Sequence, residues 1–370
     1  MSKVKIDIVS RVHIGSGEIL QYGSDFINFQ EGGDNYVGII SPRKIMSLIK
    51  NDTKALDAWI ATIERKKSII DFMKTYAPKA ITDDYCFRID HTYETLKEND
   101  TLQTFIHNGL GDPYIPGSSI KGAIRTAVLS NIINKKNEVE NLVNPTRINA
   151  KAIEQHLLGE NPNKDIYRFL KIGDAVFGNN YENIVRLFSI NERETNSYWD
   201  TSKSQLVETL MPKDSSVCEI KLDLKAYGYA KKYVQEFPEC MSSLNKMFST
   251  INQHTKSLLA HEIKYWQDHI NNPNAENVDK YIKNLEIIME QIQKCKDPSK
   301  TSCILRLGAG SGWRFITGAW AETFEKFNES IVPVARPQNQ RYSNYNFPKS
   351  RRVDSSCKPL GFIRMTLLED

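Results

Sequence analysis

The sequence predicts an α+β fold in which antiparallel strands are combined with a helical hairpin. Residues 4–14 alternate apolar and polar side chains, the pattern of a half-buried strand. Within residues 240–295, two runs with helical periodicity are separated by Asn-Asn-Pro-Asn, which predicts two antiparallel helices. Strand patterns return at residues 303–307 and 361–368. The hairpin is therefore expected to be inserted between strands, and its polar faces lack a basic stripe, which predicts a protein-contacting or peripheral element.

Turn and cap residues indicate the remaining elements. Gly-Gly-Asp-Asn between two apolar runs predicts a β-hairpin, and Ser41 followed by Pro42 predicts the start of a helix. Tyr36 and Tyr114 each begin a pattern of strand, turn and helix, and this weak internal repeat fits tandem ferredoxin-like units. Residues 133–213 show no clear pattern. The β-hairpin is expected at residues 25–40 and an amphipathic helix at residues 56–73. A strand is expected at residues 85–89 and a second helix at residues 118–132.

Length and composition are those of an ordinary globular protein. The chain has 370 residues, 40% of them hydrophobic and 25% charged, which fits two domains or one domain with an insert. No apolar run reaches the roughly 18 residues that a membrane helix requires, and the N-terminus has no apolar signal core, so we expect a cytoplasmic protein. The six cysteines are scattered without a C-x-x-C pair. This pattern predicts neither a zinc site nor disulfides, and no cofactor is expected.

The distribution of charge is more informative than the net charge of +4. Residues 330–353 contain no acidic residue, and their basic residues are interleaved with aromatic ones. Such a segment is either a solvated loop or an arm that holds RNA, because cations neutralise phosphates and aromatic rings stack on unpaired bases. We favour the arm. The basic residues are Arg336, Arg341, Lys349, Arg351 and Arg352, and the aromatic ones are Tyr342, Tyr345 and Phe347.

A turn leads into a helix at residues 115–125, with the sequence IPGSSIKGAIR. Proline and glycine shape the turn, and Ser118 or Ser119 is expected to cap the helix, so that the backbone N–H groups of its first turn face outward. Lys121 and Arg125 are four residues apart and share one face of the helix. The motif is either a phosphate-binding helix start or a well-capped amphipathic helix with two solvated cations.

A glycine motif follows the expected strand near residue 305, in the segment LRLGAGSGWR at residues 305–314. Three glycines at alternate positions let a backbone approach a ligand closely, as phosphate-cradling loops do. Trp313 occupies the third glycine place of a dinucleotide fingerprint and no Walker lysine is present, which weakens a nucleotide-binding enzyme as an alternative. Trp313 instead provides a ring that stacks on a base, and Arg314 a cation that holds phosphate.

Catalytic candidates are few. His13 lies at the rim of the first strand, where it is either a general base or a structural histidine in a glycine turn, and no nucleophile or carboxylate partner is evident nearby. Gly-Gly-Asp-Asn at residues 32–35 lacks the second carboxylate of two-metal chemistry, so a plain turn and no metal site are expected there.

Four segments together resemble the RAMP superfamily of CRISPR-associated RNA-binding proteins. They are VHIGSG at residues 12–17, the motif at residues 115–125, LGAGSGW at residues 307–313 and PLGFIRMTL at residues 359–367. Their order and spacing, the form of the glycine loop and the helical insert before it are similar to the family of fifth subunits of the type III-A (Csm) effector complex.

The resemblance implies an RRM-like ferredoxin fold divided into a RAMP region at residues 1–228, an inserted helical hairpin at residues 229–300, and the glycine loop with closing strands at residues 301–370. It implies that the motif loops grip the CRISPR RNA (crRNA) at the end of the complex that holds its 3′ part. Other Csm-complex RAMP subunits are the implied partners, and a host nuclease that trims the crRNA is a further candidate. The implied RNA-binding residues are His13, Gly15, Ser16, Gly17, Gly117, Ser118, Ser119, Lys121, Arg125, Gly308, Gly310, Ser311, Gly312, Trp313, Arg314, Arg336, Arg341, Arg351 and Arg352.

Two functional hypotheses stay open at this point. The first is a non-catalytic crRNA-binding subunit that assists crRNA maturation. The second is a metal-independent RAMP endoribonuclease that processes crRNA with His13 as general base. The target-cleaving sibling subunit uses an aspartate on a loop after its first strand. Asp25 lies in that general region, but the residues around it match no motif, so this activity is not assigned.

Overall fold

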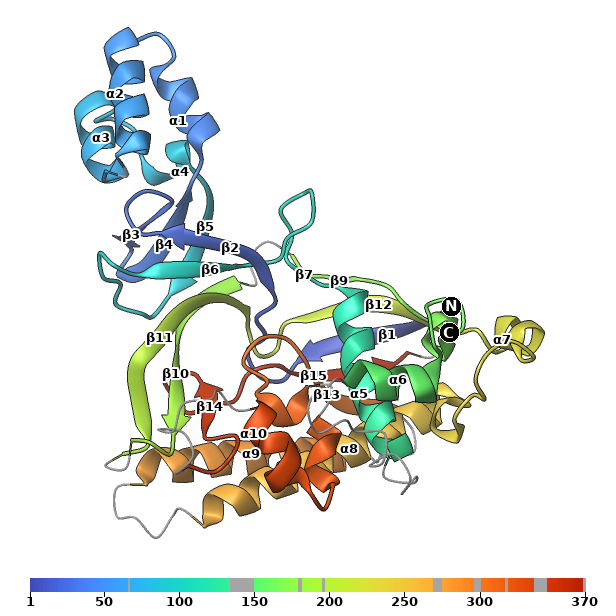
Figure 1. Ribbon diagram of the computed structural model, residues 1–370. Helices are drawn as coiled ribbons and strands as arrows, with labels where there is room; N and C mark the ends of the chain where they lie inside the picture. Colours follow the sequence, from blue (N-terminus) through green and yellow to red (C-terminus); the bar gives the residue numbers. More distant parts are fainter. Residues whose placement is uncertain are drawn as a thin grey trace.

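The computed structural model describes residues 1–65, 67–133, 150–178, 182–194, 197–268, 275–295, 301–316, 319–335 and 345–368. The fold is α+β, as predicted, with a five-stranded sheet, an eight-stranded sheet and a small two-stranded one. A separate group of helices stands at the far end of the eight-stranded sheet, away from the long helices of the body (Figure 1). No described helix combines the length and apolarity needed to cross a membrane.

The five-stranded sheet is antiparallel throughout and brings the two ends of the chain together. Its strand order is β13-β15-β1-β12-β8. Ile6 of β1 pairs with Met365 of β15 and with Ser216 of β12, so the first strand lies between these two. Val4, Ile6 and Ile8 are buried, as the alternating pattern predicted. In sheet order, the strands cover Ser302–Arg306, Phe362–Leu367, Ser2–Ile8, Ser215–Leu222 and Leu170–Ile172.

Helices α5 (Gly117–Ile133) and α8 (Leu244–Gln267) pack against this sheet and form the main core with it. Ile124 of α5 and Ile251 of α8 are completely buried there. The strand order β15-β1-β12-β8, with α5 after β1 and α8 after β12, is that of a ferredoxin-like unit. The prediction of a helical hairpin is confirmed, but the expectation that it is peripheral is wrong for α8, which supplies part of the core.

The second helix of the hairpin, α9 (Glu276–Lys294), accounts for the extra strand in this sheet. It runs antiparallel to α8, because Trp266 near the end of α8 contacts Tyr281 near the start of α9, with ring centroids 6.3 Å apart. The chain is thereby reversed once more, so β13 runs in the same direction as β1. The chain then returns as β15, which lies between β13 and β1 and is antiparallel to both.

The eight-stranded sheet is curled around an apolar interior. Its order is β2-β6-β11-β10-β5-β4-β3, with β14 also paired to β10. Strand β5 is parallel to β10 and β6 is parallel to β11, whereas the other pairs are antiparallel. This sheet does not repeat the order of the first one, so a second ferredoxin-like unit stays a prediction. In chain order, the strands β2, β3, β4, β5, β6, β10, β11 and β14 cover Gly15–Gln21, Phe26–Glu31, Asp34–Ile40, Cys86–Thr92, Thr101–Phe105, Glu182–Asn191, Trp199–Leu210 and Ser350–Val353.

Four helices between β4 and β5 cover one end of the curled sheet. The predicted helix start is confirmed, because the Ser41 hydroxyl accepts a hydrogen bond from the Lys44 amide at 3.3 Å. The single helix expected at residues 56–73 is two helices, since the chain turns to bring Trp59 and Phe72 into one core with ring centroids 5.2 Å apart. The helices α1 to α4 cover Pro42–Ile49, Thr53–Glu64, Ile69–Tyr76 and Thr82–Tyr85.

The strand expected at residues 4–14 ends earlier than predicted, and the residues after Ile8 cross from one sheet to the other. Strand β1 ends at Ile8, Val12 forms an isolated bridge with Leu210, and β2 begins at Gly15. The glycines after His13 therefore do not form the tight turn that the sequence indicated. The remaining described strands and α-helices are β7 (Tyr114–Ile115), α6 (Ala150–Leu158), β9 (Ala175–Val176), α7 (Leu224–Ala230) and α10 (Val332–Ala335).

Candidate nucleic-acid interface

Three segments that are far apart in the sequence meet at the glycine loop, which we define as residues 307–313. The Leu307 amide donates to the Gly361 carbonyl at 2.9 Å, and the Gly361 amide donates to the Arg11 carbonyl at 2.8 Å. The Ala309 amide donates to the His13 carbonyl at 2.8 Å. Three of the four sequence motifs, from both ends of the chain, therefore form one surface.

The glycines of the loop have backbone angles that other residues rarely adopt. Gly308, Gly310 and Gly312 have φ of 80°, 76° and 76°. A Cβ atom at Gly308 would lie 2.5 Å from the His13 carbonyl oxygen, so glycine is also required there for close approach. Gly308 and Ala309 are exposed at the apex of the loop.

A buried arginine below the loop fixes its orientation. Arg306 donates to the carbonyls of Leu360 at 2.8 Å and Gly310 at 3.2 Å, and Ser311 donates to the Gly308 carbonyl at 2.6 Å. Burial lowers the pKa of Arg306 to about 10, so the guanidinium is still charged at neutral pH. Within the described ranges, the amides of Gly310 and Gly312 have no hydrogen-bond partner. A loop whose carbonyls are hydrogen-bonded to the protein and whose amides have no partner is suited to bind an anion.

His13 is buried next to the glycine loop. Its side chain is only 2% exposed, and Nδ1 lies 2.7 Å from the Glu208 carbonyl oxygen. Burial lowers the pKa of the imidazole, which keeps it neutral at physiological pH. A general base has to reach its substrate, so burial argues against a catalytic His13 and for its role as the floor of the glycine loop. Gly15, Ser16 and Gly17 are exposed beside it in β2.

The start of α5 differs from the predicted anion site. The Gly117 amide already donates to the Asp174 carboxylate at 2.7 Å, and a Cβ atom at Gly117 would lie 2.2 Å from the Ile172 carbonyl oxygen. Ser118 and Ser119 lie inside the first turn and do not cap it, which corrects our expectation. Glycine is needed here because the helix start packs directly on the chain after β8.

The two cations of α5 also differ from each other. Arg125 pairs with Glu154 at 3.1 Å and with Asp165 at 2.7 Å, so two carboxylates already neutralise its charge, and its phosphate contact stays a prediction. Burial would lower the pKa of Arg125, but these two carboxylates raise it above its usual value. Lys121 stays half-buried next to them, and burial lowers its pKa.

The family of the chain is established by sequence comparison. A family model described as the RAMP superfamily matches residues 5–315. The chain belongs to the RAMP superfamily. This RAMP chain is 22% identical over 404 residues to the CRISPR system Cms protein Csm5 of Methanocaldococcus jannaschii, covering 99% of the chain and 89% of that relative.

Two solved structures share the fold of this RAMP chain. One is a chain of the cryo-EM structure of a Csm-crRNA-target RNA ternary complex in a type III-A CRISPR-Cas system, with a TM-score of 0.67 and 16% identity. The match covers 99% of this RAMP chain and 100% of the solved chain. The other is the crystal structure of T. onnurineus Csm5, with a TM-score of 0.65 and 16% identity. That match covers 97% of this RAMP chain and 99% of the solved chain. The RAMP fold expected from the sequence motifs is thus confirmed.

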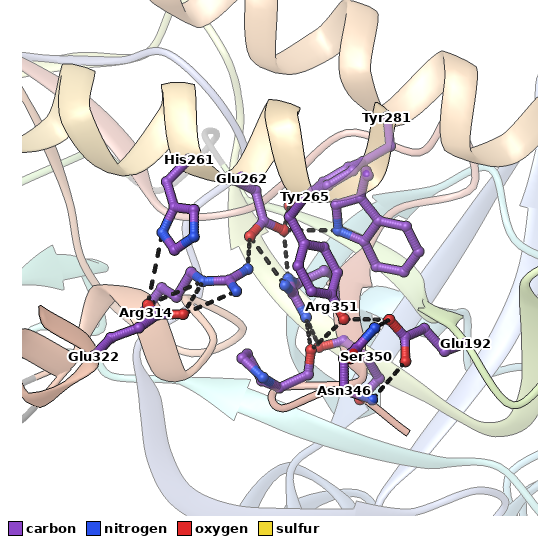
Figure 2. A network of polar contacts seen from close by, with 12 residues as sticks. Glu192, His261, Glu262, Tyr265, Tyr281, Arg314, Glu322, Asn346, Ser350 and Arg351 are labelled. Carbon is purple, nitrogen blue, oxygen red and sulfur yellow. Dashed lines mark hydrogen bonds and ion pairs between the residues drawn. The ribbon is translucent and has the colours of Figure 1, made fainter. Parts of the chain in front are cut away.

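Two arginines that the sequence assigned to RNA are instead buried around one glutamate of the RAMP core. Glu262 of α8 accepts hydrogen bonds from Arg314 at 2.5 Å and from Arg351 at 3.0 Å (Figure 2). Arg314 also pairs with Glu322 at 3.0 Å. Their side chains are 4% and 7% exposed, so a contact of Arg314 or Arg351 with RNA would require these ion pairs to open, and it stays a prediction. They attach α8 to the chain after the glycine loop and to β14.

The remaining predicted residues of the arm and loop have mixed outcomes. Arg352 is half-buried, donates to the Lys203 carbonyl at 2.6 Å, and its Cβ atom lies beside Gly310, so it stays a candidate phosphate contact. Trp313 is half-buried against Phe327 and Phe347, with centroids 5.4 Å and 5.0 Å away. Arg336, Arg341 and Tyr342 lie outside the described residues.

Sequence reasoning missed the residues that support this RAMP surface. Arg306 is a charged residue between two apolar ones in a strand, which is the signal that could have indicated a buried cation. Asp174 and Glu262 gave no signal, because their partners are far away in the sequence. Asp25 has a local role, accepting from the Gln21 amide at 2.8 Å. The described ranges contain no group of three or more His, Cys, Asp or Glu side chains placed to hold a metal ion.

Proposed function

We propose that this RAMP chain is the crRNA-binding subunit of a type III-A (Csm) effector ribonucleoprotein. In this proposal it caps the end of the complex that holds the 3′ part of the crRNA, contacts other Csm RAMP subunits and assists crRNA maturation. Support comes from RAMP membership and from similarity along nearly the whole chain to a chain of a Csm-crRNA-target RNA complex.

The glycine loop is the observation that carries the proposal. Its apex is exposed, its glycine amides are unpaired within the described structure, and the buried Arg306 holds the Gly310 carbonyl inward. Backbone amides in such a loop bind phosphate oxygens without reading the base. This chemistry suits a subunit that holds one guide RNA after another, whatever the guide sequence.

A charge placed at the apex of the loop tests the assignment. Ala309 is exposed, so Ala309→Glu adds a carboxylate next to the expected phosphate, and Ala309→Gln adds a side chain of the same size without charge. In the assembled Csm complex, crRNA affinity of the Glu variant should be about five- to thirty-fold below that of the Gln variant, roughly 1–2 kcal/mol. Fluorescence anisotropy with labelled crRNA measures both.

Equal crRNA affinity of the two Ala309 variants would overturn the proposed role of the loop. A host nuclease that trims the crRNA remains a proposed partner, and its association with the complex is tested by co-purification. The alternative of a His13-dependent endoribonuclease gains no support from a histidine that is buried beneath the loop.

A further inference from the structure

A basic and aromatic segment outside the four sequence motifs projects from the body of the molecule. It comprises residues 224–235, here called the α7 arm, and lies at the outer edge of the fold beyond β12 (Figure 1). The α7 arm contains three lysines and three tyrosines and no acidic residue. These residues are Lys225, Lys231 and Lys232, and Tyr227, Tyr229 and Tyr233.

The base of the α7 arm is firmly attached to the fold. The Tyr227 ring packs against Phe169 and Phe237, with centroids 5.6 Å and 4.7 Å away, and its hydroxyl accepts from the Phe237 amide at 2.9 Å. Asp223 accepts from the Ala226 amide at 3.3 Å and so caps the short helix. The outward side chains of the arm are therefore presented from a fixed support.

Of the two acidic residues that flank the arm, Asp223 is already paired, whereas Glu236 is exposed. Asp223 binds Lys221 at 3.1 Å and Lys171 at 3.3 Å, and these lysines hold the pKa of its carboxyl below its usual value. The three lysines of the arm itself are exposed, and none of them has a carboxylate partner in the part of the chain that the structure describes. Their charge is thus available to a ligand.

Two rings of the arm are unusually open to solvent. Tyr229 is 79% exposed and Tyr233 is 77% exposed. Arg168 is exposed nearby, over the ring of the Phe169 that supports Tyr227, and it also lines a hollow of about 490 Å³ with Lys121 of the α5 motif. Acidic side chains line that hollow as well, whereas the α7 arm itself contains none.

We propose that the α7 arm binds single-stranded RNA as a second contact besides the glycine loop. The three lysines neutralise backbone phosphates, and Tyr229 and Tyr233 stack on unpaired bases, which gives affinity without sequence preference. The inference rests on the proposed function, because the RNA that reaches the arm is the RNA that the glycine loop holds.

The salt dependence of RNA binding tests the charges. Full-length protein is titrated with a fluorescein-labelled oligo(A) RNA at several salt concentrations. Each phosphate contact contributes about 0.7 to the slope of log affinity against log salt, so changing the three arm lysines to Ala should flatten the slope by about 2. The matched control changes three exposed lysines in the segment that contains helices α1 to α4, and it should leave the salt slope unchanged. The control residues are Lys54, Lys74 and Lys79.

Ring substitutions test the stacking. Tyr229→Ala and Tyr233→Ala should each lower the affinity about 5- to 150-fold with little change of the salt slope, whereas Tyr229→Phe and Tyr233→Phe keep the ring and should bind like the natural protein. Thermal unfolding of every variant confirms folding.

The outcomes separate this inference from the proposed function. RNA binding that is unchanged in the arm variants, while the natural protein binds well, overturns the inference and leaves the proposed function intact. Absence of RNA binding by the natural protein, alone and in the Csm complex, overturns both. Arm variants that bind RNA normally but no longer assemble with other subunits would assign the arm to a protein partner and would also overturn the inference.

Discussion

Glu262 is the residue on which the surroundings of the glycine loop depend most. It is almost fully buried, and its carboxylate accepts hydrogen bonds from two arginines, from the Trp266 indole at 2.9 Å and from the Tyr281 hydroxyl at 3.2 Å. Burial alone would raise the pKa of Glu262, but Arg351 and Arg314 lower it to about 2. A buried carboxylate without its cationic partners destabilises the folded protein. Buried guanidiniums that lose their carboxylate do the same.

Removing the charge of Glu262 should therefore destabilise the protein strongly. Glu262→Gln leaves two buried guanidiniums with less counter-charge, and we expect a loss of about 3–5 kcal/mol in the free energy of unfolding. Glu322→Gln is the control, because Glu322 is more exposed and Arg314 keeps Glu262. Urea denaturation compares the two, and an equal loss in both would contradict the central place of Glu262.

The same carboxylate predicts a dependence of stability on pH. The pKa of Glu262 is lower in the folded chain, at about 2, than the usual 4.5, so its contribution is complete above pH 4.5 and is lost as pH falls toward 2. The expected loss is on the order of 3 kcal/mol. The difference in unfolding free energy between the natural protein and Glu262→Gln should shrink across this window, and a constant difference would refute the assignment.

At the scale of the element, the glycines around the loop have different roles. Gly361 has φ of 92° and a Cβ atom there would lie 2.2 Å from the Leu307 carbonyl oxygen, whereas a Cβ atom at Gly312 meets nothing within 4 Å. Both substitutions to Ala place a side chain on a left-handed backbone, which costs roughly 1–2 kcal/mol. Only the first also forces two strands apart.

Thermal unfolding of the two glycine variants tests this difference. Gly361→Ala should lower the unfolding free energy by clearly more than Gly312→Ala, because it adds a clash with the backbone to the same backbone strain. If both variants lose the same amount, the close approach of residues 307 and 361 is not a requirement of the fold.

Local patterns predicted elements well where the signal lies in neighbouring residues. The hairpin of β3 and β4, the Ser41 cap and the two long helices were all predicted, because turns, caps and helical periodicity are short-range features. Residues 4–14 were misread, since the alternation continues across the crossing from one sheet to the other. The strands β10 and β11 pair with each other but were missed, because residues 133–213 show no clear pattern in the sequence.

The candidate site was predicted as a set of motifs but not as a set of contacts. The glycine loop, the residues after β1 and the closing segment do come together, as the resemblance implied. The roles of individual cations could not be predicted, because Glu262 lies 52 residues before Arg314 and 89 before Arg351. A basic residue without a visible partner in the sequence is not thereby free to bind RNA.

At the scale of the whole molecule, the first sheet explains why the loop can form. Strand β15 from the end of the chain lies directly beside β1 from its start, and the reversal by α9 places β13 next to it. Three segments lie next to each other at one end of these strands. They are residues 11–15 after β1, the glycine loop after β13 and the segment before Phe362 of β15. One sheet thus fixes all parts of the proposed RNA contact.

This end of the first sheet is proposed to hold the backbone of the crRNA. Ultraviolet cross-linking of the assembled Csm complex, followed by mass spectrometry of the peptides attached to RNA, tests it most directly. We expect cross-linked peptides that contain residues 11–17 and 307–313. RNA cross-links elsewhere on this subunit, with none on these two segments, would contradict the account.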